Sequence, residues 1–220
     1  MPSMYDTIME LPFFKGIGED QLSQLLEKTS VEFLKYDDGD IIAKADESVS
    51  YLNFILSGRV RQTYRLSNFD ICVDEILGKG SVMGALNLYG MVTSYTSTCL
   101  ALGRVGIMRI GKSQYMNILQ SDKIYILNFV NYLSAASQKM PWIMKSIGES
   151  SIHRTLRILT ESFVSRLAET VMVAGEDKEI ARYCGVSEEE FKEWKTSELA
   201  HNRIIVNQRG IFLKSPHLLR

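Results

Sequence analysis

The feature that most constrains the fold is a change of hydrophobic period near residue 111. Between residues 31 and 110, short runs rich in β-branched and aromatic residues are separated by turn residues, as at 37–40, at Ser57-Gly58 and at 78–80. Strands that repeat at roughly 8–12 residues with turns between them predict an antiparallel sandwich or roll. From Lys112 onward the apolar residues recur at helical spacing. We therefore predict an α+β chain in which an N-terminal β-roll precedes a set of helices.

The composition is that of an ordinary globular protein and gives no whole-chain attraction to nucleic acid. Of 220 residues, 45% are hydrophobic and 23% are charged, and the formal net charge is −1. Such a balance neither favours nor excludes a protein that binds DNA with one face. The chain has no run of about 18 apolar residues that would span a membrane, and its first residues lack the pattern of a signal peptide. We therefore expect a cytoplasmic protein with no membrane partner.

The sequence contains no pattern for a metal site, a disulfide or an enzyme. Cys72, Cys99 and Cys184 are far apart and odd in number, so neither a disulfide framework nor a Cys-x-x-Cys pair can be built from them. The three histidines are equally scattered. Nucleophile–base pairs, a P-loop and the glycine motif of dinucleotide-binding folds are absent from the sequence. We therefore expect no metal, no cofactor and no enzymatic activity.

A long helix over about residues 112–140 is predicted to join two copies of the chain. Its apolar and aromatic residues are Met116, Leu119, Ile124, Leu127, Val130 and Leu133, with Tyr115, Tyr125, Phe129 and Tyr132. This is more apolar surface than contact with one small domain requires. A two-fold homodimer is the economical explanation, and a helix wholly covered by its own roll is the alternative. Pro141 ends or kinks the helix.

A second domain is expected after a boundary near residues 145–151. Residues 1–145 would form a sensor domain that includes the dimerisation helix, and residues 146–220 would form the second domain. The first helix of that domain would begin after the N-cap Ser151 and end at Gly175. Its apolar stripe consists of Ile152, Leu156, Leu159, Phe163 and Leu167.

Residues 177–194 have the pattern of a helix-turn-helix. Asp177 can cap the first helix, Gly185 supplies the permissive backbone of the turn, and Ser187 caps the second helix. Phe191 and Trp194 would point back to the core. A generic helical hairpin could imitate this pattern. Residues 203–214 then predict two strands around a polar turn that ends in glycine. The expected domain is a winged helix, whose second helix enters the major groove of DNA.

The order of these parts resembles the family of the cyclic-AMP receptor protein and the fumarate-nitrate regulator (CRP/FNR). The resemblance is specific in Asp38–Ile41, in the Ile-Leu-Ser-Gly-Arg-Val stretch at 55–60 and in the glycine-spaced loop at 78–84. It implies a cyclic-nucleotide-binding-like jelly roll, a dimerisation helix and a C-terminal winged helix-turn-helix. It also implies a homodimer that regulates transcription, with double-stranded operator DNA, RNA polymerase and a small-molecule effector as partners.

The sequence departs from the family where its nucleotide-binding members hold the ligand. In those members a Glu after the first glycine binds the ribose and an Arg neutralises the phosphate. Here Gly84 is followed by Ala85, and Tyr95, Thr96 and Ser97 stand at the place of the arginine stretch. Hydrogen bonds to charged groups are worth roughly 1.5–3 kcal/mol each, so losing two weakens binding about 10²–10⁴-fold. We therefore expect an effector other than cyclic AMP, or none, in the pocket formed by Gly84, Ala85, Tyr95, Thr96 and Ser97.

Two other kinds of family sensor are also disfavoured by the residues. An iron–sulfur sensor needs a cluster of cysteines, which the scattered Cys72, Cys99 and Cys184 do not supply. A haem sensor needs an axial ligand in the roll or the dimer helix, and the first histidine in the chain is His153.

The expected DNA-contacting helix is unusually acidic. Family members present arginines after the capping serine, whereas this chain has Glu188–Glu190 and Glu193 there. The candidate DNA-binding residues are Ser187, Glu189, Lys192 and, at the tip of the wing, Arg209. The leading hypothesis is a dimeric transcription regulator. The alternative is a ligand-sensing or protein-interaction module of the same fold, in which the winged helix no longer binds DNA and the acidic helix face is simply solvated.

Overall fold

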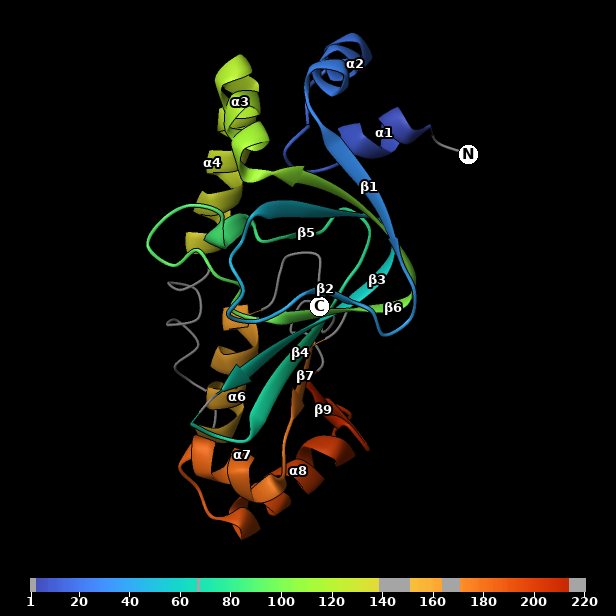
Figure 1. Cartoon of the computed structure of the whole chain (residues 1–220). Helices are drawn as coiled ribbons and strands as arrows, with labels where there is room; N and C mark the ends of the chain where they lie inside the picture. The colour runs from blue at the N-terminus through green and yellow to red at the C-terminus, as the bar shows by residue number, and fades with distance from the viewer. Residues whose placement is uncertain (1–2, 67, 139–150, 164–170, 214–220) are drawn as a thin grey trace. The chain divides into compact units, whose positions relative to one another are not determined.

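A computed structural model of the chain describes residues 3–66, 68–138, 151–163 and 171–213 (Figure 1). The chain forms two compact units. The first unit combines Met1–Val60 with Leu77–Gln138, and the second combines Arg61–Ile76 with Lys139–Arg220. The boundary predicted near residue 145 lies outside the described residues. Within the described ranges, none of the helices has the length and apolar character needed to cross a bilayer.

The first unit is an antiparallel roll flanked by helices, which confirms the predicted α+β class. Strand β6 pairs with β1 from Val31↔Ile110 to Tyr36↔Val105, and also with β2 and β3, while β5 pairs with β3. The elements of the first unit are α1 (Met4–Met9), α2 (Glu19–Lys28), β1 (Val31–Tyr36), β2 (Ile41–Ala43), the first part of β3 (Tyr51–Leu66), β5 (Val82–Met83), η1 (Ala85–Asn87), β6 (Thr98–Gly111), α3 (Lys112–Ser121) and α4 (Lys123–Ser137). The end of β3 and nearly all of β4 (Ile71–Leu77) belong to the second unit.

The turn predicted at Ser57-Gly58 is wrong, because β3 runs through both residues. Gly58 has a φ of 84°, and a Cβ placed there would lie 2.3 Å from the carbonyl oxygen of Arg104. Glycine is therefore required at this position by the close approach of the β6 backbone and by a left-handed conformation inside a strand.

An aromatic cluster joins the N-terminal helices, the roll and α4. The ring of Phe13 lies 5.7 Å from Phe54, 5.7 Å from Tyr115 and 5.5 Å from Phe129, measured between ring centroids. These rings are buried in one apolar cluster of the first unit. Edge-to-face and tilted pairs of this kind add to the stability that burial itself supplies.

The single helix predicted over residues 112–140 is wrong, since the described part divides into α3 and α4. The break is at Asp122, which has an extended backbone (φ −155°, ψ 145°) and accepts a hydrogen bond from the Ile124 N–H at 2.9 Å. The carboxylate thus caps a new helix. On α4, Tyr125 and Phe129 are buried in the unit's own core. Ile126, Leu127 and Val130 remain 46%, 60% and 48% exposed.

The second unit contains α6 (Ser151–Phe163), β7 (Val171–Ala174), α7 (Asp177–Cys184), α8 (Glu188–Ala200), β8 (Ile204–Asn207) and β9 (Gly210–Leu213). The expectation that one helix runs from Ser151 to Gly175 is wrong, because Val171–Ala174 form a strand. Val-Met-Val suits a strand better than a helix. Strand β7 pairs with β9 on one side and with β4 on the other, and β9 pairs with β8.

The α7–α8 connection follows the predicted pattern. Gly185 has a left-handed backbone (φ 71°), and the Val186 N–H donates to the Ala181 carbonyl at 3.1 Å. The predicted cap is confirmed: the Ser187 hydroxyl accepts from the Glu190 N–H at 3.1 Å. The cap of α7 is Glu176 and not Asp177, which is the first helical residue. Beneath the helices the buried core contains Ile152, Leu156, Ile180, Ala181, Cys184, Phe191, Ile204 and Ile211.

Candidate functional sites

The first candidate site is the loop that contains Gly84, Ala85 and Tyr95–Ser97, which the sequence predicts to be the ligand pocket. Gly84 has a left-handed backbone (φ 86°) and precedes the short helix η1, whose first residue, Ala85, is buried. A Cβ added at Gly84 would lie 3.0 Å from the Tyr51 carbonyl oxygen and 3.3 Å from Cε1 of Tyr95. The backbone and the Tyr95 ring therefore occupy the space beside Gly84.

Tyr95 is held in place by both its backbone and its side chain. Its N–H donates to the Glu47 carbonyl at 2.9 Å, and its carbonyl accepts from the Asp46 N–H at 2.8 Å. Its hydroxyl accepts from Asn53 Nδ2 at 3.1 Å and lies 3.4 Å from the Tyr51 carbonyl oxygen. Burial raises the pKa of Tyr95 to about 12. The phenol is therefore neutral and offers a ligand no charge.

The other residues of this loop add no charged anchor. Ser97 is buried, whereas Thr96 is exposed. The methyl group of Ala85 can neither accept from a ribose hydroxyl nor pair with a cation. The structure thus brings Gly84 and Tyr95 together and leaves Thr96 on the surface.

A cavity of about 770 Å³ lies beside this loop within the first unit. It shares Val49 and Tyr51 with the surroundings of Gly84. Its cation is Lys112, whose Nζ lies 5.1 Å from the centroid of the Tyr89 ring. The lining residues are Ser30, Glu32, Ser48, Val49, Ser50, Tyr51, Tyr89, Thr93, Gly111, Lys112, Ser113, Gln114 and Met116. They come from four separate stretches of the chain, so no local motif could have identified the cavity from the sequence.

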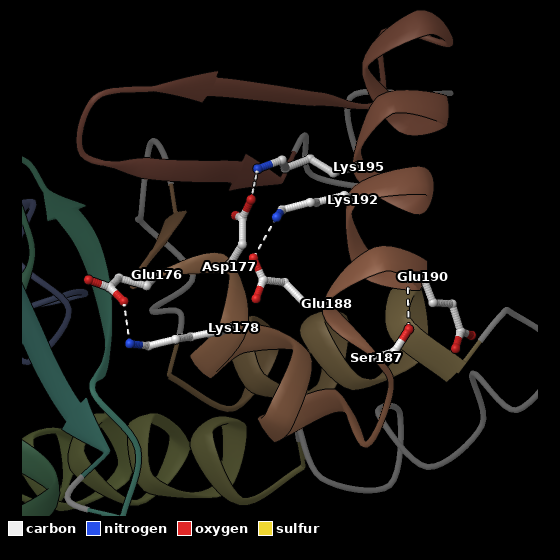
Figure 2. A network of polar contacts seen from close by, with 8 residues as sticks. All are labelled: Glu176, Asp177, Lys178, Ser187, Glu188, Glu190, Lys192 and Lys195. Atoms are coloured by element: carbon white, nitrogen blue, oxygen red, sulfur yellow. Dashed lines mark hydrogen bonds and ion pairs between the residues drawn. The ribbon is translucent and has the colours of Figure 1, made fainter.

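The second candidate site is the exposed face of α8, where carboxylates neutralise both lysines (Figure 2). Lys192 Nζ lies 2.5 Å from Glu188 Oε1, one helical turn away. Lys195 pairs with Asp177 of α7. The hydrogen bond and the charge of Glu188 raise the pKa of Lys192. Because each ammonium has a carboxylate partner, the helix presents little free positive charge.

The exposed carboxylates of this helix outnumber its cations. Glu189, Glu190 and Glu193 are exposed, and Glu190 is drawn beside the cap in Figure 2. Ser187 is exposed too, but its hydroxyl already serves as the cap. Arg209 lies apart from α8, in the exposed turn between β8 and β9, where its N–H donates to Asn207 Oδ1 at 2.8 Å. Of the four candidate residues, Glu189 and Lys192 share the exposed side of α8.

A buried carboxylate near the end of α8 was not predicted from the sequence. Glu198 is only 6% exposed. Its Oε1 accepts from Arg203 Nη1 at 3.2 Å, and its Oε2 lies 3.4 Å from His153 Nδ1 of α6. This acid ties α8 to α6 and to the start of β8. Only the tertiary structure places these residues together, since His153 is distant in the sequence.

Comparison with known proteins supports the fold of a cyclic nucleotide-binding domain. Residues 33–122 match the family model of the cyclic nucleotide-binding domain. The catabolite activator protein of Thermus thermophilus is similar over 94% of this chain and 96% of its own, with 15% identity and a TM-score of 0.54. The c-di-GMP responsive global regulator CLP of Xanthomonas campestris is similar over 90% of this chain and 100% of its own, with 15% identity and a TM-score of 0.51. No curated protein matches the sequence.

Proposed function

We propose that the chain is a dimeric transcription regulator of the CRP/FNR type, which binds operator DNA and responds to an effector other than cyclic AMP or to none. The observation that carries this proposal is the order of elements in the second unit. Helices α7 and α8 meet at Gly185, and the β8–β9 hairpin follows them. A cyclic nucleotide-binding domain precedes them in the chain. Two helices with a hairpin wing are the parts of a winged helix-turn-helix.

In this proposal α8 is the recognition helix and the β8–β9 turn is the wing. Glu189 would accept from cytosine amino groups in the major groove. Lys192 would contact bases or phosphates after exchanging Glu188 for DNA, and Arg209 would contact phosphate from the wing. RNA polymerase would be the protein partner, as the family resemblance implies, and the protein would act in the cytoplasm without enzymatic activity.

The exposed side of α4 supports the dimer. Ile126, Leu127 and Val130 are aliphatic, lie on one side of the helix and are all exposed. The opposite side of α4 is buried in the unit's own core through Tyr125 and Phe129. A second copy of α4 is the proposed cover for the aliphatic side, because two-fold symmetric dimers place the same surface on both subunits.

The Gly84–Tyr95 contact supports an effector other than cyclic AMP. A cyclic phosphate needs a cation, and the neighbouring side chain is the neutral phenol of Tyr95. The cavity beside this loop, with Lys112 at one side, offers a separate place for a small ligand.

The acidic face of α8 favours a second candidate function. With Lys192 and Lys195 paired, Glu189, Glu190 and Glu193 dominate the exposed face. Such a face would repel phosphates and suit contact with another protein. The same fold would then serve as a ligand-sensing or protein-interaction module.

A gel-shift assay with the DNA upstream of the chain's own coding region, repeated over a range of salt, separates the two functions. A regulator should bind with an affinity that falls steeply with salt, because phosphate contacts release counterions. Arg209→Ala should weaken binding about equally for all DNA sequences. It should also reduce the slope of the logarithm of the binding constant against the logarithm of salt concentration by roughly one. Glu189→Ala should change the preferred sequence. Absence of binding at low salt would favour the interaction module.

A further inference from the structure

The cavity of about 770 Å³ in the first unit is distinct from the pocket that the sequence predicts. It is walled by the start of α3, the end of β6, the start of β1 and the segment that leads into β3 (Figure 1). Gly84, Ala85 and Tyr95–Ser97 do not line it. Sites that hold small molecules have volumes of about 300–1,000 Å³. The cavity is therefore large enough for a ligand of its own.

Hydroxyl groups make up most of the cavity wall. Seven of the thirteen lining residues carry one, and the apolar side chains are those of Val49 and Met116. A hydroxyl both donates and accepts hydrogen bonds, so the wall suits a hydroxylated ligand and offers little to an apolar one. Four of the seven belong to exposed serines, which a ligand can reach from solvent: Ser30, Ser48, Ser50 and Ser113.

Lys112 supplies the charge of the cavity. It is the first residue of α3, and its N–H donates to the Ser50 carbonyl at 2.9 Å, which fixes its backbone in the wall. Its ammonium lies 5.1 Å from the centroid of the Tyr89 ring. Among the described residues, no carboxylate forms an ion pair with this ammonium. The positive charge of Lys112 is therefore available to an anionic ligand.

The carboxylate in the wall does not cancel that charge. Glu32 Oε2 accepts from Nε and Nη2 of Arg109 at 3.0 and 2.7 Å. Because Glu32 is neutralised by Arg109, the three side chains together leave a charge of about +1 beside the cavity. The first turn of α3 contains no acidic residue, and its N-cap, Gly111, makes no side-chain cap. The positive end of the helix dipole adds to the charge of Lys112.

Two tyrosine rings complete the wall. The guanidinium carbon of Arg109 lies 4.3 Å from the centroid of the Tyr51 ring. The Tyr89 hydroxyl donates to the Lys112 carbonyl at 3.2 Å. Gly111 leaves room for Tyr51, since a Cβ there would lie 3.8 Å from Cε1 of that ring. The rings are thus held in place and offer apolar surface to the carbon skeleton of a ligand.

We propose that this cavity binds a small phosphate ester with a hydroxylated carbon skeleton, such as a sugar phosphate. The phosphate, with a charge of about −2, pairs with Lys112 and accepts from the hydroxyls of Ser50 and Ser113. Lysine is a common partner of phosphate in proteins. The other hydroxyls of the wall and Glu32 bind the hydroxyls of the skeleton. That this ligand is the effector rests on the proposed function, but the site itself does not.

Calorimetry on the full chain tests the ligand class. Glucose 6-phosphate and glycerol 3-phosphate are the probes, with glucose and inorganic phosphate as controls. At least one ester should bind saturably with a dissociation constant below about 1 mM. Glucose should not bind in this range, and inorganic phosphate should bind at least about tenfold more weakly. No binding of either ester, or binding of glucose as tight as that of its phosphate, would overturn the proposal.

A charge substitution tests the role of Lys112. Lys112→Gln should weaken binding of the ester at least about tenfold, because it removes a hydrogen bond between charged groups. Lys123→Gln is the matched control: Lys123 is exposed, is the first residue of α4 and does not line the cavity. It should retain the wild-type affinity within about twofold. Equal affinities of the two variants would overturn the assignment of Lys112.

A steric substitution tests the place of binding. Ser113→Trp should fill the cavity and abolish binding of the ester. Gln120→Trp, at an exposed position of α3 that does not line the cavity, should leave it intact. In the wild type, the ester should slow hydrogen exchange of the amides at 48–51 and 112–116 and leave those at 95–97 unchanged. Protection confined to 84–97 would place the ligand in the predicted pocket and overturn the proposal.

DNA binding by the same proteins separates this site from the proposed function. The gel-shift assay is repeated with and without the ester that binds, on the wild type and on Lys112→Gln. Binding of the ester with the expected variant pattern, but no DNA binding in any form, supports the site and contradicts the proposed function. DNA binding by a chain that binds neither ester contradicts the site alone.

Discussion

The ring of Tyr95 lies against Gly84, so close that a Cβ added to the glycine would come within 3.3 Å of Cε1 of the tyrosine. In the nucleotide-binding relatives that the sequence resembles, a charged anchor stands where this neutral ring is found. The sequence lacks both charged anchors, and the side chain that lies beside Gly84 is this uncharged ring. The contact supports the proposal that the effector is not cyclic AMP.

Cyclic nucleotides should therefore bind poorly or not at all. Two missing hydrogen bonds to charged groups weaken affinity about 10²–10⁴-fold. Titration calorimetry with cyclic AMP and with cyclic GMP should show no binding below roughly millimolar concentration. Micromolar affinity for either nucleotide would show that another cation replaces the arginine.

The exposed aliphatic side of α4 should hold two copies together. Sedimentation velocity at micromolar concentration should give about twice the chain mass of 25.0 kDa. Leu127→Asp would bury a carboxylate without a partner in the seam and should weaken the dimer at least about 100-fold. Leu199→Asp, the same substitution at an exposed residue of α8, is the matched control and should leave the dimer intact. A monomeric wild-type chain would contradict the assignment of this surface.

The half-buried phenol of Tyr95 should make the free energy of unfolding depend on pH in the alkaline range. Its pKa rises to about 12 from an ordinary value of 10.0, chiefly because burial disfavours the charged form. Between these pH values the unfolded chain has lost the proton and the folded chain retains it, so the free energy of unfolding falls as pH rises. The stability that the neutral phenol contributes is fully present below about pH 10 and is lost above about pH 12.

Urea unfolding at a series of pH values measures this effect. Between about pH 10 and pH 12, loss of the Tyr95 proton on unfolding can lower the free energy of unfolding by up to about 1.4 kcal/mol per pH unit. Tyr95→Phe removes this group, so the slope across that window should be less steep by up to that amount. Identical slopes for the wild type and the variant would mean that Tyr95 is more accessible than the structure shows.

Glu198 should be more important to stability than the other acids of α8. Glu198→Ala removes the acceptor of Arg203 and the carboxylate beside His153, and should cost about 1–3 kcal/mol in urea unfolding. Glu193→Ala, on the exposed face of the same helix, should change stability by less than about 0.5 kcal/mol. Equal effects of the two substitutions would contradict the buried role of Glu198.

The sequence predicts most of the elements, and the errors have identifiable causes. The helix break at Asp122 could have been found, because an aspartate before a new helical run is an N-cap signal; the continuous apolar pattern on both sides concealed it. The sequence pattern places Val171–Ala174 in a helix, because four residues are too few to show the period of a strand. It places a turn at Gly58, because close approach to the backbone of Arg104 is a tertiary property.

In the candidate sites, too, some residues are specified by a local sequence pattern and others are brought together only by the tertiary structure. Gly84 and Tyr95 could be paired from the family pattern, and Ser187 could be assigned as a cap from its local sequence. The ion pairs of Lys192 and Lys195 are partly local, since Glu188 is one turn from Lys192. The pairing of β4 with β7 joins residues about a hundred positions apart, and no periodic pattern specifies such a partner.

The most direct test of the account is whether α8 faces DNA. Glu188→Arg with Glu193→Arg removes two carboxylates from this helix and frees Lys192 from its ion pair. Measured by fluorescence anisotropy on one duplex over a salt series, the double variant should bind more tightly than the wild type, with a salt slope steeper by about one to two. Glu19→Arg with Asp20→Arg, an equal charge change on the exposed start of α2, should give a much smaller gain. If the α8 variant binds no better than this control, α8 does not face DNA and the central claim is contradicted.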